Sequence, residues 1–235
     1  MNVAIIAAAG QGTRLKGKRA KQFLELGGVP VIIHTLRRFE QCADIQEVII
    51  VLPAPDVACF LALAGQYGLR KLARVVAGGP TRAESIRRGL QAVRAATAEI
   101  IAVHDGVRPF VAPEEISRTI AAARLSGAAI LVAPAVDTIK EVEDGRVRRT
   151  LERATLRHAL TPQCFRYALL CEAYERAHNL GAEITDDSAL VEQLGVEVAV
   201  VEGDSRNIKI TRPEDLALAE ILLKQEAASG SQKSE

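Results

Sequence analysis

The sequence of 235 residues contains no tryptophan, and aromatic side chains make up only 3% of it. Proteins that hold single-stranded nucleic acid stack its bases on aromatic side chains, so the composition excludes a stacking platform of that kind. The chain also lacks an excess of one charge, because its formal net charge is +1. No overall field favours nucleic acid or an anionic membrane, and we expect neither as a partner. Any site for an anion must therefore be built locally.

Cysteine is scarce, and Cys42, Cys59, Cys164 and Cys171 form neither a C-x-x-C pair nor a cysteine–histidine cluster with zinc spacing. We interpret them as reduced and mostly buried thiols, and we expect no metal site built by the protein. Long apolar runs are missing too, since no segment reaches the ~18 residues of a membrane helix. No charged and apolar leader precedes the first predicted strand. These absences predict a cytoplasmic protein.

Hydrophobic residues make up 49% of the chain and charged residues 25%, values typical of a globular protein with a full core. Apolar runs bounded by glycine or proline alternate with segments of helical periodicity. This alternation predicts an α/β fold, a Rossmann-like and mostly parallel sheet with helices on both faces. The expected strands are the run at Val3–Ile6, Glu47–Leu52, Ala73–Ala77, Glu99–His104 and Ala128–Ala133. The expected helices are Pro30–Cys42, Val57–Tyr67, the segment opened by a Thr81–Glu84 capping box, and Pro113–Leu125.

The alternation breaks at a polar segment, residues 135–157, in which Asp144-Gly145 is flanked by short β-type runs. We interpret this segment as a projecting β-hairpin, called the arm below. An isolated hairpin is only marginally stable, so we expect the arm to pack on a second copy of the chain and form a homodimer. The later elements expected are helices at Arg166–Asn179 and Ser188–Leu194, strands at Val196–Val201 and Asn207–Ile210, and a last helix from Thr211 to about Glu226. We expect one domain, residues 1–227, and a flexible tail, residues 228–235.

The first predicted strand ends in a turn of small residues, Ala8-Ala9-Gly10-Gln11-Gly12, followed by Arg14 and Lys21. Glycine lacks a Cβ, so the backbone can bend sharply and bring N–H groups close to a polyphosphate. The dinucleotide fingerprint G-x-G-x-x-G is excluded because its third glycine position holds Leu15. The P-loop is excluded because Arg19 stands where its hydroxyl residue is required. The turn indicates a phosphate cradle of another class.

Two more corners follow predicted strands at their carboxyl ends, Gly78-Gly79 and Asp105-Gly106. In open parallel sheets, ligands bind beyond the carboxyl ends of the strands, so we expect the three corners to share one site. The cationic residues that suit phosphate binding are Arg14, Lys21, Arg153 and Lys209. No nucleophile motif such as Gly-x-Ser-x-Gly is present.

These groups suit a transferase whose nucleophile is already an anion. A phosphate monoester with a second pKa near ~6 is largely dianionic at neutral pH, so it can attack the α-phosphorus of a nucleotide without a protein base. Catalysis then consists of positioning and charge neutralisation. Lysine and arginine side chains would stabilise the α-phosphate and the departing pyrophosphate.

Eight clusters along nearly the whole chain resemble, in order, those of a known family. They are Ala8-Ala9-Gly10-x-Gly12-x-Arg14 with Lys21-Gln22, Gly78-Gly79-x-x-Arg82-x-x-Ser85, Asp105-x-x-Arg108-Pro109, Asp137-Thr138-x-Lys140, Arg153, Thr161-Pro162-Gln163, Thr185-Asp186, and Asn207-Ile208-Lys209 with Thr211-Arg212-Pro213-Glu214-Asp215. The first three resemble the cytidylyltransferases of the nucleotidyltransferase superfamily. The others are similar to the 2-C-methyl-D-erythritol 4-phosphate cytidylyltransferase family.

The resemblance implies transfer of CMP from CTP to 2-C-methyl-D-erythritol 4-phosphate with release of pyrophosphate, a step of non-mevalonate isoprenoid biosynthesis. It implies Mg²⁺ bound mainly through the CTP phosphates, and it makes Arg14 and Lys21 the stabilisers of the transition state. Around the nucleotide it places Ala8, Ala9, Gly10, Gly12, Gly79, Ser85 and Gly106. Around the sugar-alcohol phosphate it places Asp105, Thr138, Arg153, Thr161, Thr185 and Lys209. In the family, the equivalents of Thr138 and Arg153 reach the partner's active site from the arm, which implies a homodimer.

The chain departs from the family's pattern at three positions. Ala20 replaces a proline before Lys21, so we expect a more mobile loop there, and Ala7 replaces a common proline in the first turn. Arg206 stands where an acidic residue often precedes the Asn-Ile-Lys run.

Two other functions stay open. One is a cytidylyltransferase for another polyol phosphate, such as ribitol 5-phosphate, and the arm and the Thr161 region favour the methylerythritol acceptor over it. The other is a non-catalytic nucleotide-binding protein on the same fold, against which the retention of Arg14 and Lys21 argues.

Overall fold

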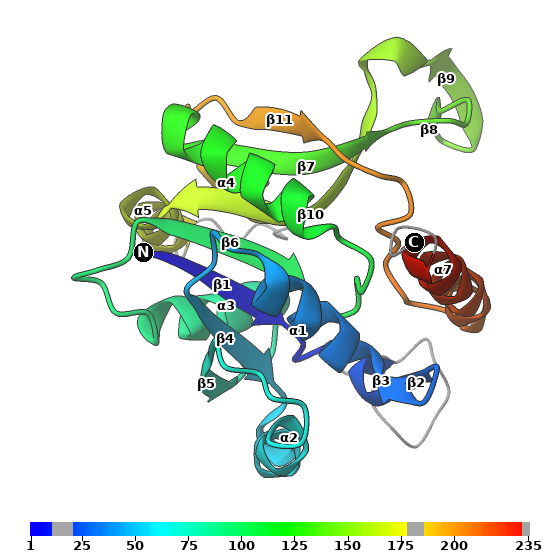
Figure 1. The fold of residues 1–235 in the computed structure, drawn as a ribbon. Helices are drawn as coiled ribbons and strands as arrows, with labels where there is room; N and C mark the ends of the chain where they lie inside the picture. Colours follow the sequence, from blue (N-terminus) through cyan, green and yellow to red (C-terminus); the bar gives the residue numbers. More distant parts are fainter. Residues whose placement is uncertain (11–20, 178–185, 232–235) are drawn as a thin grey trace.

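The computed structural model describes residues 1–10, 21–177 and 186–231. Its centre is a seven-stranded sheet with the order β11-β7-β10-β6-β1-β4-β5 (Figure 1). The strands are β1 (Asn2–Ala7), β4 (Glu47–Leu52), β5 (Leu72–Ala77), β6 (Ile100–Asp105), β7 (Ala128–Pro134), β10 (Arg157–Arg166) and β11 (Ala199–Glu202). Neighbouring strands run parallel except that β10 is antiparallel to both β6 and β7. The predicted mostly parallel sheet is confirmed.

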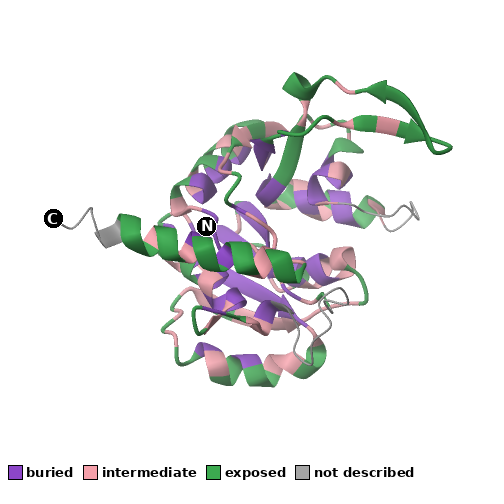
Figure 2. Ribbon diagram, turned by 90° about the vertical axis from the view of Figure 1, so that its right-hand side faces the viewer, coloured by how far each residue is buried: buried purple, intermediate pink, exposed green. Residues whose placement is uncertain are grey.

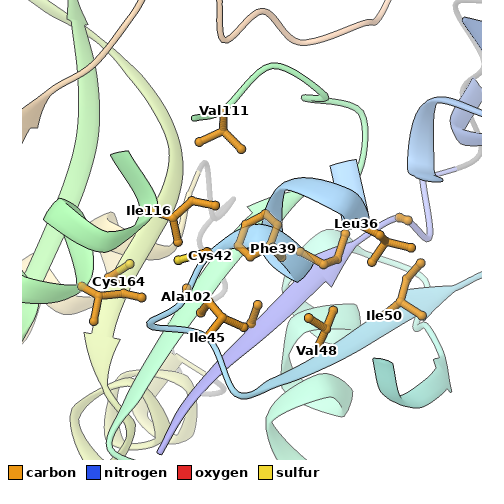
Figure 3. Close-up of a cluster of buried hydrophobic side chains, with 14 of the residues drawn as sticks. Leu36, Phe39, Cys42, Ile45, Val48, Ile50, Ala102, Val111, Ile116 and Cys164 are labelled. Atoms are coloured by element: carbon orange, nitrogen blue, oxygen red, sulfur yellow. The ribbon is translucent and has the colours of Figure 1, made fainter. Parts of the chain in front are cut away.

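Helices cover both faces of this sheet (Figure 1). They are α1 (Val31–Gln41), α2 (Val57–Ala64), α3 (Arg82–Gln91), α4 (Pro113–Ser126), α5 (Tyr167–Ala177), α6 (Asp187–Glu192) and α7 (Pro213–Ser231), with short 3-10 turns at Lys21–Phe23, Ala54–Asp56 and Arg153–Thr155. Alternate residues of β1 face opposite sides, as in any strand buried on both faces. Ala4 and Ile6 join a core cluster with α1, α2 and α4, whereas Val3 and Ile5 join one with α3, α5 and α6. Figure 3 shows the first cluster, with Phe39 of α1 at its centre.

Two small sheets lie outside the central one. β2 (Glu25–Leu26) pairs with β3 (Val29–Pro30), and α7 packs beside them through a cluster that includes Leu26 and Leu222. β8 (Lys140–Glu143) pairs with β9 (Arg146–Thr150) to form the hairpin of the arm. Asp144 and Gly145 at its tip have positive φ angles of 50° and 73°, as a two-residue hairpin turn requires. The hairpin projects from the molecule and is largely exposed (Figures 1 and 2).

The structure differs from the predicted elements in its second half. β10 is a long strand in the middle of the sheet, where we expected only the end of the arm and a connection to the next helix. Its Pro162 lies in the register shift between Ala159 and Gln163, where the ladder to β7 is interrupted. A proline within a run argues against a central strand, and this interruption is what makes it tolerable here.

Two further expectations near the C-terminus are wrong. Residues 207–210 are not a strand, because the segment joins the loop after β6 through one backbone hydrogen bond, Ile210 N to Val107 O at 2.9 Å, and forms no ladder. α7 continues to Ser231, whereas we expected the last helix to end at about Glu226. Within the described parts of the chain, no helix is long and apolar enough to cross a membrane.

Candidate active site

A cleft of about 370 Å³ lies at the carboxyl ends of the central strands. Its walls come from the three predicted corners and from the segment before α7. The lining residues are Ala7, Ala8, Ala9, Gly10, Gln22, Gly79, Pro80, Thr81, Arg82, Ser85, Asp105, Val107 and Lys209. Residues of all three predicted corners therefore line one cleft.

Close packing of the corners after β1 and β6 shapes the floor of the cleft. The Gly106 N–H donates to the carbonyl of Ala7 at 2.9 Å. A Cβ on Gly106 would lie 2.8 Å from both the Ala8 Cβ and the Ile32 Cδ1, closer than packed carbon atoms approach. Gly106 therefore acts as the spacer that lets the two corners touch, and it is Ala8 that faces the cleft.

The start of α3 forms the second wall. Thr81 caps the helix, its Oγ1 accepting from the Glu84 N–H at 3.1 Å, as the capping-box spacing predicts. The Ser85 hydroxyl donates to the Thr81 carbonyl at 2.8 Å and accepts from the Gly79 N–H at 3.1 Å. Ser85 thus holds the Gly79 turn in place against the cleft.

Asp105 is the charged centre of the cleft. Its Oδ2 lies 2.8 Å from the Nζ of Lys209 and 3.4 Å from the Nε of Arg108, and its Oδ1 lies 3.6 Å from the Nε of Arg82. Burial alone would raise the pKa of Asp105, but these three cations outweigh burial and hold it well below its usual range. With the buried Asp187, which pairs with Arg82, two carboxylates face three cations, and the surplus of one positive charge suits an anionic ligand.

A buried hydrogen-bond chain supports Asp105 from below. His104 lies with its Nε2 3.0 Å from the Arg108 carbonyl, so this nitrogen must donate. Burial lowers the pKa of His104 to about 4, so the ring is neutral at neutral pH and its Nδ1 accepts the hydroxyl proton of Thr161 at 3.0 Å. The same Thr161 Oγ1 accepts from the Asp105 N–H at 3.2 Å. Thr161, predicted beside the sugar phosphate, is buried here with its proton already committed.

Gln22 carries a buried amide in the cleft wall. Its side chain is 1% exposed, and among the described residues neither amide atom has a hydrogen-bond partner. Leaving a buried polar group unpaired costs free energy, so native structures seldom do so without a reason.

Thr138 and Arg153 lie elsewhere, in a separate hollow at the base of the arm. Arg153 is exposed, and its Nη1 donates to the Val136 carbonyl at 3.0 Å. The hollow and the cleft share no lining residue. Within one chain, the structure therefore brings together Asp105 and Lys209 but not the two arm residues.

Three predicted site residues, and the side chain of a fourth, are not covered by the structure. Gly12, Arg14 and Thr185 lie outside the described residues, as does Ala20. Lys21 begins the short turn Lys21–Phe23, and its side chain is likewise outside the described part.

Sequence reasoning assigned no role to three residues that shape this site. Arg82 and Arg108 stand in the quoted motifs, and their spacing from Gly79 and Asp105 was the signal available. His104 ends a strand and has no motif of its own, so only the fold reveals its contact with Thr161. Arg206, the third departure from the family's pattern, pairs with Asp204 at 2.6 Å and does not line the cleft.

The donor set indicates how a divalent cation would be held. Among the described residues, no three histidine, cysteine, aspartate or glutamate side chains gather as a metal centre would require. In the same part of the chain, Asp105 is the one carboxylate that lines the cleft, and its Oδ2 is already bound by cations. Magnesium commonly keeps its waters and binds through substrate phosphates, so these residues fit an ion that arrives on a nucleotide.

Comparisons with known proteins agree along nearly the whole chain. Residues 2–225 match the model of the 2-C-methyl-D-erythritol 4-phosphate cytidylyltransferase family. A relative with that name from Syntrophus aciditrophicus is 45% identical over 95% of this chain and 96% of its own. One from Bacillus velezensis is 42% identical over 97% of both.

Solved structures give the same result. The 4-diphosphocytidyl-2C-methyl-D-erythritol synthase of Anaerococcus prevotii aligns with a TM-score of 0.85 at 34% identity, over 95% of this chain and 96% of that one. The 2-C-methyl-D-erythritol 4-phosphate cytidylyltransferase of Thermus thermophilus aligns with a TM-score of 0.75 at 37% identity, over 94% and 98%. With its Asp105-centred cleft and these full-length matches, the chain belongs to the 2-C-methyl-D-erythritol 4-phosphate cytidylyltransferase family.

Proposed function

We propose that the Asp105 cleft is where this chain performs its family's reaction, the transfer of CMP from CTP to 2-C-methyl-D-erythritol 4-phosphate. The products are 4-(cytidine 5'-diphospho)-2-C-methyl-D-erythritol and pyrophosphate, a step towards isoprenoid precursors. The observation that carries the proposal is the meeting of three cations with the carboxylate of Asp105 at the carboxyl ends of β1, β5 and β6. Such a site holds anions and still offers a carboxylate oxygen to a sugar hydroxyl.

CTP would occupy the side of the cleft formed by Ala8, Ala9, Gly10, Gly79 and Ser85. This wall consists of small residues and backbone, so a base and its phosphates can approach closely. Gly12 would belong to the same wall, and Gly106 supports it from beneath.

The acceptor would lie against Asp105 and Lys209, with Thr161 beneath them. Thr185, which precedes α6 in the sequence, is assigned to the acceptor as well. The Oδ2 of Asp105 is bound by Lys209 and Arg108, whereas the one cation of the described residues at its Oδ1 is Arg82 at 3.6 Å, beyond hydrogen-bond distance. Oδ1 can therefore accept a hydrogen bond from an acceptor hydroxyl. The Nζ of Lys209 can bind the acceptor phosphate.

The chain needs no general base for this reaction. The acceptor phosphate is largely dianionic at neutral pH and attacks the α-phosphorus directly, displacing pyrophosphate. Arg14 and Lys21 would neutralise the charge that grows on the α-phosphate and on the leaving group. His104 is neutral and fully buried, so it supports the turn and takes no proton from the substrate.

Magnesium would be the divalent cation, held mainly by the phosphates of CTP. When bound, it supplies charge neutralisation and a fixed geometry for the triphosphate. On the side of the cleft opposite the triphosphate, Asp105, Lys209 and Arg108 position the acceptor.

A homodimer would complete the site. Thr138 and Arg153 line the hollow of the exposed arm and do not reach the cleft of their own chain. If the arm extends to a second copy, both residues meet that copy's acceptor phosphate. The exposed Val136, Val142 and Val147 give the arm an apolar surface suited to such packing.

The test is a pyrophosphate-release assay that crosses CTP, UTP, ATP and GTP with methylerythritol and ribitol phosphates. We expect release only with CTP and 2-C-methyl-D-erythritol 4-phosphate, dependent on added magnesium. Faster turnover with ribitol 5-phosphate would replace the proposed acceptor. Nucleotide binding without pyrophosphate release under any combination would establish a non-catalytic protein.

A further inference from the structure

Arg82 lies between two carboxylates and forms a hydrogen bond with only one of them. Its Nη2 donates to the Oδ2 of Asp187 at 2.7 Å, a strong charge-assisted hydrogen bond. Its Nε lies 3.6 Å from the Oδ1 of Asp105, too far for a hydrogen bond. Burial alone would lower the pKa of Arg82, but the charges of Asp187 and Asp105 raise it above its ordinary value, so the guanidinium stays charged.

Asp187 is itself held firmly at the start of α6. The carboxylate is fully buried, and the hydroxyl of Tyr174 on α5 donates to its Oδ1 at 2.5 Å. The Oε1 of Gln163 accepts from the backbone N–H of Asp187 at 3.0 Å, which ties this point to β10. Burial and the neighbouring Asp187 raise the pKa of Tyr174, so its hydroxyl is a donor at neutral pH.

The contrast between the two carboxylates has a consequence for Asp105. Arginine and carboxylate groups prefer a bidentate pair with two parallel hydrogen bonds. If Arg82 were released from Asp187, a small movement would let it close onto Asp105 and occupy Oδ1. The Oδ2 of Asp105 already binds Lys209 and Arg108, so no acceptor atom would then remain for a substrate.

We propose that Asp187 and Tyr174 are positioning residues that restrain Arg82 and thereby keep Oδ1 of Asp105 open to the acceptor. Neither residue lines the cleft, so both act through Arg82. The inference rests on the proposed function, because it assigns Oδ1 to a hydroxyl group of the acceptor substrate.

The first test is Asp187→Asn. The amide still accepts a hydrogen bond but attracts the guanidinium less, so Arg82 should move onto Asp105. We expect kcat/KM for the acceptor to fall about tenfold while the KM for CTP stays within about twofold, because the nucleotide wall is untouched. A crystal structure of the variant should show an Arg82–Asp105 hydrogen bond. The matched control is Glu99→Gln, which weakens the Glu99–Arg124 pair at the opposite end of β6.

The second test is the double variant Arg82→Gln with Asp187→Asn. Without a guanidinium, nothing closes onto Asp105, so Asp187→Asn should cause no further loss of activity when it is added to Arg82→Gln. Losses that multiply would mean that the two residues act independently, and the inference would be wrong.

Tyr174→Phe provides a milder variant if Asp187→Asn folds poorly. We expect a loss of about two- to fivefold in kcat/KM for the acceptor, and no further loss in the Arg82→Gln background. Tyr167→Phe, on the same helix, is the control and should leave activity unchanged. Full activity in both Asp187→Asn and Tyr174→Phe overturns the inference, whereas an inactive wild-type enzyme overturns the proposed function itself.

Discussion

Asp105 shows how much of this site depends on the surroundings of a single residue. Three cations approach its carboxylate, and a buried threonine holds its backbone N–H. Because its pKa is held far below the usual range, protonation of Asp105 should not limit activity at any pH at which the enzyme remains folded. The stability that this ionised group contributes is lost only as the pH falls towards its depressed pKa.

Lys209 offers a direct test of the acceptor side. We expect Lys209→Met to lower kcat/KM for the acceptor by about 10- to 100-fold, since a charge-assisted contact to the phosphate and to Asp105 Oδ2 is lost. The KM for CTP should change little, and steady-state kinetics with each substrate varied in turn gives both values. Lys224→Met, at an exposed position of α7, is the control. Equal losses for both substrates would contradict the assignment.

His104 predicts a specific pH dependence of stability. Its pKa falls from the ordinary 6.5 to about 4 in the folded state because the ring is buried. Between about pH 6.5 and pH 4, His104 therefore binds a proton in the unfolded chain but not in the folded chain. The free energy of unfolding keeps its full value above about pH 6.5 and falls by about 3 kcal/mol towards pH 4.

Urea unfolding at a series of pH values measures this decline. His104→Gln should be less stable at neutral pH but should flatten the decline, whereas His158→Gln, at an exposed position on β10, should preserve it. An unchanged slope in His104→Gln would assign the decline to other groups.

The sequence indicates which residue types gather at this site but not how their protons and charges are shared. Asp105 could be named because it stands at a predicted corner, and Lys209 and Ser85 because they stand in motifs that resemble the family's. The fold brings all three to one cleft. The commitment of Thr161 to His104 depends on a tautomer fixed by a carbonyl, which no sequence pattern records. Asp187 looks like part of a helix cap, yet Asp186 caps the helix and Asp187 pairs with Arg82 far away in the chain.

At the scale of elements, α3 positions the nucleotide wall because it packs very closely on β1. Gly89 permits this approach, since a Cβ there would lie 2.7 Å from the Ile5 Cγ2 and 3.2 Å from the Val51 Cγ2. The helix that carries Arg82 and Ser85 is thereby held against the strand that leads to Ala8.

Gly89→Ala should therefore destabilise the protein. We expect about 1–3 kcal/mol, because the added methyl group forces α3 away from a packed core. Gly65→Ala is the matched control. A Cβ added at Gly65 would lie 3.9 Å from its nearest neighbours, and the φ of Gly65, −57°, is helical. The free energy of unfolding of that variant should rise by about 0.4–1 kcal/mol, because alanine has less conformational entropy than glycine in the unfolded chain. Similar urea midpoints for the two variants would contradict the close-packing argument.

Elements were predictable where the local pattern and the tertiary environment agree. β4 was expected at Glu47–Leu52 and has those bounds, because a run buried on both faces is apolar throughout. β10 could not be recognised, because it carries Pro162 and follows directly on a polar arm. Only its two neighbours, β6 and β7, make it a strand.

At the scale of the whole molecule, the proposed dimer makes an unusual prediction. Lys21→Ala damages the site of its own chain, and Arg153→Ala damages the site of the partner. At an acceptor concentration far below the raised KM of Arg153→Ala, each variant alone should be nearly inactive. A heterodimer of the two keeps one intact site, so co-expression in equal amounts should restore about a quarter of the wild-type activity.

Sedimentation of the purified mixture should confirm that it is dimeric. No recovery of pyrophosphate release in a mixed dimer would mean that Arg153 serves its own chain. In Arg153→Ala alone we expect a higher KM for the acceptor with CTP affinity little changed, and equal losses for both would instead indicate a damaged arm.

The position of β10 also affects how the chain reaches its fold. β6 is completed at Asp105, but the strand that covers its outer edge is made only when residues 157–166 have been synthesised. Until then the nascent chain presents an apolar edge with free backbone N–H and C=O groups, a template for pairing with other chains. Contacts between strands so distant in sequence also slow folding. Ribosomes that stall within the arm should therefore yield aggregating fragments, although more than half of the sheet's strands are already present in them.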